Sequence, residues 1–220
     1  MHEMKVLVIG GVAAGTKAAA KWKRENRGDE VLLLTKSADI SYAGCGLPYY
    51  VGGSIANKEE LIVNTPAKYQ GLTGVEVRTL REATQVDPVA KQVTVRQVET
   101  GEEEVYAYDK LILATGASAV KPPIPGVDLP GVFPMRAPED AITMRAYLES
   151  NGVKKAVVIG GGFIGLELAE NLFDRGISVT VVEIASQLLS GVLDPEMAQY
   201  VKNHLTQKGI RVLTGTKASA

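Results

Sequence analysis

The sequence contains one pattern twice: a short apolar run, a glycine-rich turn, a helical stretch and a second apolar run. Lys5–Ile9 predicts a buried strand near the start, and residues 156–159 predict its counterpart in the second half. Short apolar strands that alternate with helices are typical of parallel sheets in α/β proteins. The repeat therefore predicts an α/β fold with two Rossmann-like units, and with it two nucleotide sites.

The second glycine turn matches a dinucleotide-binding fingerprint. Gly160, Gly162 and Gly165 fill all three glycine positions of G-x-G-x-x-G between a predicted strand and a predicted helix. These glycines allow the tight turn, the approach of a pyrophosphate and close packing of the helix. Glu183 follows at the end of the next strand, where a carboxylate binds ribose hydroxyls and repels a 2′-phosphate. The pattern predicts NADH, with NADPH less favoured; the alternative is a glycine turn without a ligand.

The first glycine turn is less regular. Valine replaces the middle glycine, and Thr35 and Lys36 stand where an acidic residue is expected. The helix N-terminus still favours a pyrophosphate, Thr35 could bind a ribose hydroxyl, and Lys36 could reach the ribose or a phosphate. Taken alone, this turn leaves a nucleotide site and an empty turn equally open. The turn consists of Gly10, Gly11, Val12, Ala13, Ala14 and Gly15.

Cys45 is the only cysteine in the chain and so forms no internal disulfide. It stands between Gly44 and Gly46, and Pro48 suits the first turn of a helix. A thiol at a helix N-terminus is favoured as the nucleophilic thiolate. The alternative is a small buried apolar side chain. The neighbouring glycines and the two nucleotide units favour a redox-active thiol.

Three basic residues follow the first turn at helical spacing. Lys17, Lys21 and Arg24 are four and three residues apart, so they share one face of the predicted helix. This face could bind the phosphates of an anionic substrate, or it could be a solvated basic surface.

The region between the two repeats predicts further structure. Within residues 84–108, the stretches 92–96 and 104–108 alternate between apolar and polar side chains, which predicts an antiparallel β-meander. We expect a three-layer ββα architecture. Residues 119–152 include the most proline-dense segment and are interpreted as a linker. We therefore expect a first nucleotide domain over 1–118 and a second over 153–220. Because a doubly wound domain normally has more strands, we expect this sequence to be an N-terminal fragment of a longer chain.

Composition excludes several classes of protein. A net charge of −1 gives no general attraction to nucleic acid or anionic membranes. Two histidines and one cysteine argue against a metal site. No apolar run is long enough to span a bilayer, and cysteine usage argues against a disulfide-built secreted fold. We expect a cytoplasmic protein.

Together these motifs resemble the pyridine nucleotide–disulfide oxidoreductase superfamily, and within it a single-cysteine branch. That branch contains coenzyme A-disulfide reductases, NADH oxidases and peroxidases, and persulfide or polysulfide reductases. The resemblance covers nearly the whole chain, and its most specific part is the run from Cys45 to Tyr50. It implies FAD on the first unit, NADH or NADPH on the second, and a homodimer at full length.

The resemblance also implies individual roles. Cys45 would lie beside the flavin as the redox thiol, and Phe163 would shield the flavin until nicotinamide displaces it. Coenzyme A phosphates would bind the basic helix face, with Ser41 and Lys68 in the substrate channel. The remaining contacts would be Gly10 to Gly15 with the FAD pyrophosphate, Thr115 and Gly116 with the flavin nucleotide, and Ile164 and Glu167 with nicotinamide.

The resemblance leaves three functions open. The first is a reductase of coenzyme A disulfide or of a persulfide; Gly44 replaces an asparagine often found before the cysteine, which keeps the persulfide open. The second is an NADH oxidase or peroxidase that cycles through a cysteine sulfenic acid. The resemblance implies that such enzymes use a histidine at the position of Ala13. The absence of that histidine here argues against peroxide chemistry. The third is a non-catalytic nucleotide-binding redox sensor.

Overall fold

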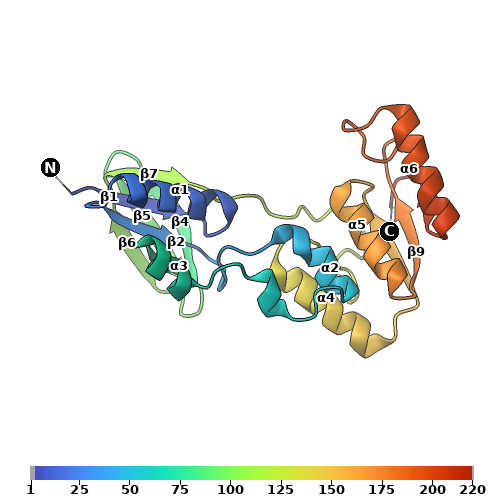
Figure 1. The fold of residues 1–220 in the computed structure, drawn as a ribbon, viewed down its shortest axis with the longest axis horizontal. Coiled ribbons are helices and arrows are strands. Elements are labelled where there is room, and N and C mark those ends of the chain that lie inside the picture. Colours follow the sequence, from blue (N-terminus) through green and yellow to red (C-terminus); the bar gives the residue numbers. More distant parts are fainter. Residues whose placement is uncertain (1–2, 220) are drawn as a thin grey trace. The chain divides into compact units, whose positions relative to one another are not determined.

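The computed structural model describes residues 3–219, which form two compact units (Figure 1). The first unit runs to Ala43 and resumes from Ile62 to Ala117. The second unit consists of Gly44–Leu61 and the residues from Ser118 onward. The predicted α/β class is confirmed in both units.

A four-stranded parallel sheet forms the centre of the first unit, in the order β3-β2-β1-β7. The connection from β1 to β2 contains helix α1, and the connection from β2 to β3 contains helix α3. Both connections run toward the same edge of the sheet, so α1 and α3 cover the same face. Val6, Val8 and Leu33 pack against Ala19 and Tyr69 on this face. The elements are β1 (Lys5–Ile9), α1 (Ala13–Glu25), β2 (Glu30–Leu34), α3 (Pro66–Thr73), β3 (Glu76–Arg78) and β7 (Lys110–Leu113).

The opposite face of this sheet is covered by the antiparallel meander. Leu7, Ile9 and Leu34 pack against Val93 and Val95 of the meander, which gives the predicted three layers. The strands are β4 (Arg81–Asp87), β5 (Gln92–Gln97) and β6 (Glu103–Ala107), in the order β4-β5-β6.

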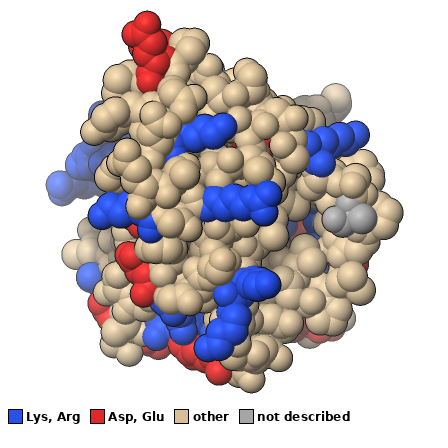
Figure 2. Space-filling view, turned by 90° about the vertical axis from the view of Figure 1, so that its right-hand side faces the viewer, with Lys and Arg blue, Asp and Glu red and all other residues tan. Residues whose placement is uncertain are grey.

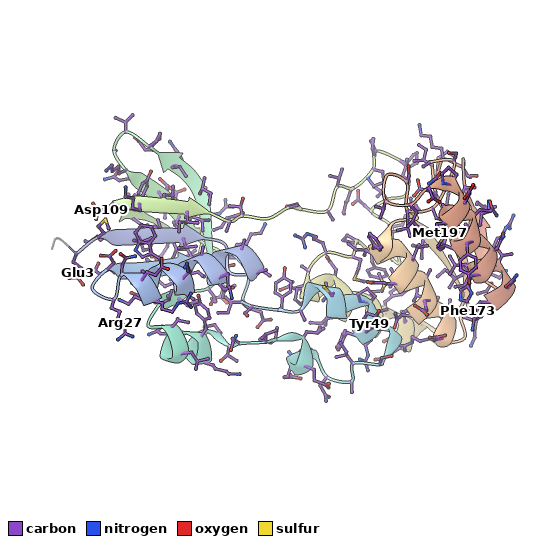
Figure 3. The ribbon with its side chains drawn as sticks, turned by 45° about the horizontal axis from the view of Figure 1, so that its top comes forward. Glu3, Arg27, Tyr49, Asp109, Phe173 and Met197 are labelled. Atoms are coloured by element: carbon purple, nitrogen blue, oxygen red, sulfur yellow. The ribbon has the colours of Figure 1, made fainter. Side chains whose placement is uncertain are left out.

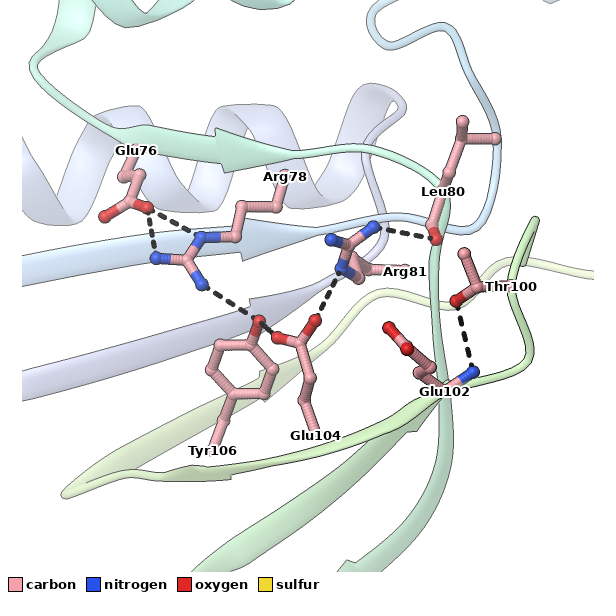
Figure 4. Close-up of polar contacts among 8 residues, drawn as sticks. All are labelled: Glu76, Arg78, Leu80, Arg81, Thr100, Glu102, Glu104 and Tyr106. Carbon is pink, nitrogen blue, oxygen red and sulfur yellow. Dashed lines mark hydrogen bonds and ion pairs between the residues drawn. The ribbon is translucent and has the colours of Figure 1, made fainter. Parts of the chain in front are cut away.

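A polar network ties the edge strand β3 to the meander (Figure 4). Arg78 pairs with Glu76 and donates to the Tyr106 hydroxyl at 3.0 Å. Tyr106 in turn donates to Glu104, whose carboxylate lies 3.3 Å from Arg81 Nε. The hydrogen bond from Tyr106 lowers the pKa of Glu104, and burial raises the pKa of Tyr106. The network favours a charged Glu104 beside a neutral phenol.

The second unit contains a three-stranded parallel sheet in the order β10-β9-β8. Val158, Val179 and Val181 pack against Leu168 and Leu172 in its core. The elements are β8 (Lys155–Ile159), α5 (Phe163–Asp174), β9 (Ser178–Val182), α6 (Pro195–Lys208) and β10 (Arg211–Leu213).

Two further segments join this core. Residues 119–152, expected as a linker, contain helix α4 (Pro138–Asn151), which buries Ala141 and Met144. Residues 44–61, expected within the first domain, also group with the second unit. They form η1 (Gly44–Gly46), α2 (Leu47–Gly52) and η2 (Lys58–Leu61).

The repeat read from the sequence extends into the loops. The N–H groups of Gly10 and Gly160 each donate at 2.8 Å to the last residue of the neighbouring strand. Further on, Ser41 donates to the carbonyl of Gly11 and Leu189 to that of Gly161, and both adopt a left-handed φ, of 50° and 49°. The two units therefore share one backbone design beyond the glycine turns.

The two sheets differ on the face away from the helices. Leu7 and Ile9 are 3% and 5% exposed beneath the meander. Their counterparts in the second sheet, Val157 and Ile159, are 65% and 58% exposed. The second unit therefore presents an open apolar sheet face.

Charged side chains do not segregate on the face drawn in Figure 2, where Lys and Arg are scattered and Asp and Glu lie among them. Across residues 3–219, no helix has the length and apolar character to cross a membrane.

Candidate nucleotide and thiol sites

Both glycine turns leave the N-terminus of the following helix without a side-chain cap. Val12 precedes α1 and Gly162 precedes α5, and neither helix has an acidic residue in its first turn. By contrast, Thr65 caps α3 and Asp194 caps α6 through side-chain oxygens. Unpartnered N–H groups at a helix N-terminus bind anions, so both turns fit a pyrophosphate.

Equivalent glycines of the two turns share two constraints, a left-handed φ at the first glycine and a close backbone contact at the last. Gly10 and Gly160 have φ values of 117° and 111°, which favour glycine. A Cβ on Gly15 would lie 1.8 Å from the Gly10 carbonyl oxygen, and one on Gly165 would lie 2.1 Å from that of Gly160. A Cβ on Gly162 would meet no atom within 4 Å. That open space is where the motif expects a pyrophosphate to approach.

Glu183 and Thr35 occupy equivalent places beneath the two turns. The Glu183 carboxylate accepts from the N–H of Gly161 at 2.6 Å and from that of Ala185 at 2.7 Å. Thr35 is only 6% exposed, and its Cβ lies 3.0 Å from the Cβ position of Gly11. Lys36 is exposed. Glu183 thus presents an oriented carboxylate, whereas Thr35 mainly packs under its turn.

The segment after β7 passes beside the first turn. A Cβ on Gly10 would lie 2.1 Å from the carbonyl oxygen of Ala114, so the two backbones are in close contact. Thr115 and Gly116 follow and are exposed, and Gly116 has a φ of 67°. The residues predicted to contact FAD therefore lie after the carboxyl ends of β1, β2 and β7 in the first unit.

The residues predicted to contact nicotinamide lie at the start of α5. Phe163 and Ile164 are 59% and 52% exposed, and Glu167 is partly buried one turn further on. Two exposed apolar side chains directly after an uncapped glycine turn offer a surface on which an aromatic ring can stack.

Cys45 is a free and exposed thiol in η1, directly before α2. Its neighbour Gly44 has open space around its Cα. The alternative of a small apolar residue packed in the core is therefore wrong. Both η1 and α2 belong to the second unit.

The predicted substrate residues are spread over the first unit. Lys17, Lys21 and Arg24 are exposed on α1, and the hydrogen bond from Lys21 lowers the pKa of Glu25. Arg24 also lines a shallow depression of about 430 Å³ between the ends of α1 and α3.

The other two predicted substrate residues are positioned by backbone contacts. Ser41 is held at the first glycine turn by its bond to Gly11, and Asn64 Nδ2 lies 3.5 Å from its hydroxyl. Lys68 is exposed on the first turn of α3. Residues 3–219 contain no cluster of His, Cys, Asp and Glu suited to a metal ion.

The fold and sites define a protein with two dinucleotide-binding units and one exposed thiol. Its sequence matches the model of the pyridine nucleotide-disulphide oxidoreductase family over residues 4–220, and the chain belongs to that family. This family uses FAD and NAD(P)H.

Three relatives, two curated proteins and one solved structure, illustrate the similarity. An NADH oxidase of Methanocaldococcus jannaschii is 40% identical over 96% of this chain and 47% of its own length. A coenzyme A disulfide reductase of Staphylococcus haemolyticus is 32% identical over 94% of this chain and 46% of its own length. The solved NAD-dependent persulfide reductase from A. fulgidus has a TM-score of 0.93 and 39% identity, over 98% of this chain and 40% of that one. The chain spans about half the length of the curated relatives it matches.

Proposed function

We propose that the full-length protein is a FAD-dependent NAD(P)H oxidoreductase that reduces coenzyme A disulfide, or a related persulfide, through Cys45. The observation that carries the proposal is the exposed, unpaired Cys45 in a chain with two glycine turns suited to pyrophosphates. The similarity to a coenzyme A disulfide reductase supports the substrate class.

The proposal assigns one cofactor to each unit. FAD would lie on the first turn with Thr115 and Gly116 beside it, and Thr35 and Lys36 near its ribose. NADH would lie on the second turn, with Glu183 at its ribose and Phe163, Ile164 and Glu167 at the nicotinamide end. When bound, FAD would take a hydride from NADH and deliver two electrons to sulfur.

The chain itself would supply the thiol and the phosphate contacts. The Cys45 thiolate attacks one sulfur of the disulfide, the S–S bond breaks, and one coenzyme A thiolate leaves. Two electrons then break the bond between Cys45 and the remaining half, releasing the second thiolate. The balance is one disulfide, one NADH and one proton to two thiols and NAD⁺. Lys17, Lys21, Arg24, Ser41 and Lys68 would bind the coenzyme A phosphates and line the channel.

Reduction of oxygen is a second candidate, favoured by the 40% identity to an NADH oxidase. In that case Cys45 would cycle through a sulfenic acid. Homodimerisation and a cytoplasmic location remain predictions from the sequence.

A comparison of NADH consumption with different electron acceptors tests the proposal. Full-length protein with bound FAD is supplied with NADH and either coenzyme A disulfide, a persulfide, hydrogen peroxide or oxygen. We expect the fastest NADH consumption with coenzyme A disulfide or the persulfide. Faster turnover with oxygen or peroxide would replace the proposal with the second candidate. Turnover with none of them would leave a nucleotide-binding redox sensor.

A further inference from the structure

Helix α2 is short and depends on outside partners at its C-terminal end. It has six residues, and carbonyl groups at a helix end lack intrahelical donors. The N–H of Gly53 already donates to the carbonyl of Tyr50, and Arg145 of α4 adds a side-chain donor at the same carbonyl. Its Nη1 lies 3.1 Å from the carbonyl oxygen of Tyr50, 3.1 Å from that of Ile55 and 3.0 Å from that of Ala56. One guanidinium thus joins the end of α2 to the loop that follows it.

The same guanidinium stacks on an aromatic ring. Arg145 Cζ lies 4.6 Å from the centroid of the Tyr50 ring, an arrangement that favours a cation. Tyr49, labelled in Figure 3, is 39% exposed on α2. The two adjacent tyrosines therefore differ, because Tyr50 meets Arg145 while much of Tyr49 is in solvent.

A second arginine binds the same helix from α5. Arg175, directly after α5, donates from Nη1 to the carbonyl oxygen of Val51 at 2.7 Å. Glu149 joins the two arginines, at 2.9 Å from Arg145 Nε and 3.7 Å from Arg175 Nη2. The hydrogen bond from Arg145 lowers the pKa of Glu149, so this carboxylate stays charged at neutral pH.

Packing fixes the rest of the helix. Leu47 and Val51 are 2% and 0% exposed, in one core with Leu168 and Leu172 of α5. A Cβ on Gly52 would lie 2.2 Å from Asn171 Oδ1, so the end of α2 directly contacts α5. Cys45 is exposed in η1, and η1 continues directly into the N-terminal end of α2.

We propose that Arg145 and Arg175 are positioning residues for the Cys45 thiol, through the C-terminal end of α2. This inference rests on the proposed function of Cys45. Thiol–disulfide exchange needs a defined approach of one sulfur to another, and a displacement of about 1 Å can cost up to about 100-fold in rate. Arginine suits this task because its planar fork donates several bonds and stacks at once, whereas lysine supplies a point charge.

The test separates two half-reactions of the full-length protein. One is the reduction of the bound flavin by NADH, and the other is the reduction of the disulfide through Cys45. Arg145→Gln should lower kcat for coenzyme A disulfide by about tenfold or more, with KM for the disulfide little changed. The rate at which NADH reduces the bound flavin should stay at the wild-type value. Arg145→Lys should recover part of the loss, and Arg175→Gln should repeat it in weaker form. Hydrogen exchange of the 44–56 backbone should be faster in each variant.

Arg96→Gln is the matched control. Arg96 pairs with Glu82 on the meander of the first unit, so its loss should change neither half-reaction. Wild-type kcat in Arg145→Gln, or an equal fall of both half-reactions, would overturn the inference. If Arg145→Gln does not fold, Arg145→Lys and Arg175→Gln decide by the same criteria. A wild-type protein that reduces no disulfide would instead overturn the proposed function. Unchanged hydrogen exchange of the 44–56 backbone in the arginine variants would overturn the inference that these arginines hold α2.

Discussion

At the scale of single residues, the contrast between Glu183 and Thr35 explains why the two turns should bind different groups. Glu183 is held by two backbone N–H groups, which fixes the direction of its charge beside Gly161. We expect Glu183→Gln to lower the preference for NADH over NADPH by about tenfold, because hydrogen bonds to a charged group contribute about 1.5–3 kcal/mol. The ratio of kcat/KM for the two nucleotides measures this. Glu170→Gln, at an exposed site on α5, is the control, and an unchanged ratio in Glu183→Gln would contradict the ribose role.

Tyr69 is a second residue with a testable role, in stability rather than chemistry. It is 5% exposed and its hydroxyl donates to the carbonyl of Thr16, which ties α3 to α1. Burial raises the pKa of Tyr69 above its usual value of 10.0. A raised pKa means that the neutral form stabilises the fold, fully below pH 10 and progressively less as the pH rises through the folded-state pKa.

We therefore expect Tyr69→Phe to lower the free energy of unfolding by about 1 kcal/mol at neutral pH, the net contribution of one hydrogen bond. The loss of Tm above pH 10 should also be smaller in this variant than in the wild type. Thermal unfolding between neutral pH and pH 11 measures both effects, with the exposed Tyr200→Phe as control. If the plots of Tm against pH stay parallel above pH 10 for the wild type and Tyr69→Phe, the neutral Tyr69 hydroxyl does not stabilise the fold in this way.

At the scale of elements, the glycine turns separate a packing role from a ligand role. A Cβ at Gly165 would collide with the Gly160 carbonyl, whereas a Cβ at Gly162 would enter open space. We expect Gly165→Ala to unfold the second unit or lower its Tm sharply. Gly162→Ala should keep the wild-type Tm and weaken NADH binding at least about tenfold, because the side chain would occupy the approach of the pyrophosphate. Calorimetry and NADH titration test this pair, and wild-type affinity in Gly162→Ala would contradict the site.

The same elements show how far local patterns predict structure. The strand, turn and helix of each repeat follow from apolar runs and glycines, and the meander follows from alternation. Helix α3 was not predicted, although Thr65-Pro66 at its start and Gly74 at its end repeat the Asp194-Pro195 and Gly209 signals of α6. Helix α4 was hidden because prolines nearby favoured a linker.

At the scale of the whole molecule, the two sheets allow one substitution to be compared in two environments. Leu7 and Ile9 are buried, and their counterparts Val157 and Ile159 are exposed. We expect Leu7→Thr with Ile9→Thr to cost several kcal/mol, since one large-to-small change in a core already costs about 2 kcal/mol or more. Val157→Thr with Ile159→Thr should leave Tm nearly unchanged and lower the binding of a hydrophobic dye by the 220-residue chain. Equal losses of Tm in both pairs would show that the second face is also covered.

Contacts between segments distant in the sequence were the least predictable part. Residues 44–61 lie between the two chain segments of the first unit, yet Leu47 and Val51 join the core of the second. The Cys45 motif predicted a reactive thiol but not the arginines that bind the adjacent helix, because Arg145 and Arg175 lie 100 and 130 residues after Cys45 and carry no motif. Glycine and cysteine patterns identify the candidate chemistry, whereas only the fold identifies what holds it in place.

In the proposed function, Cys45 carries electrons from NADH to a disulfide. The most direct measurement is the release of free coenzyme A thiol per NADH consumed, under anaerobic conditions, by full-length protein and by its Cys45→Ser variant. We predict two thiols per NADH in the wild type, and no thiol release in the variant although it still binds both cofactors. Thiol release at the wild-type rate by the Cys45→Ser variant would show that Cys45 does not carry the electrons.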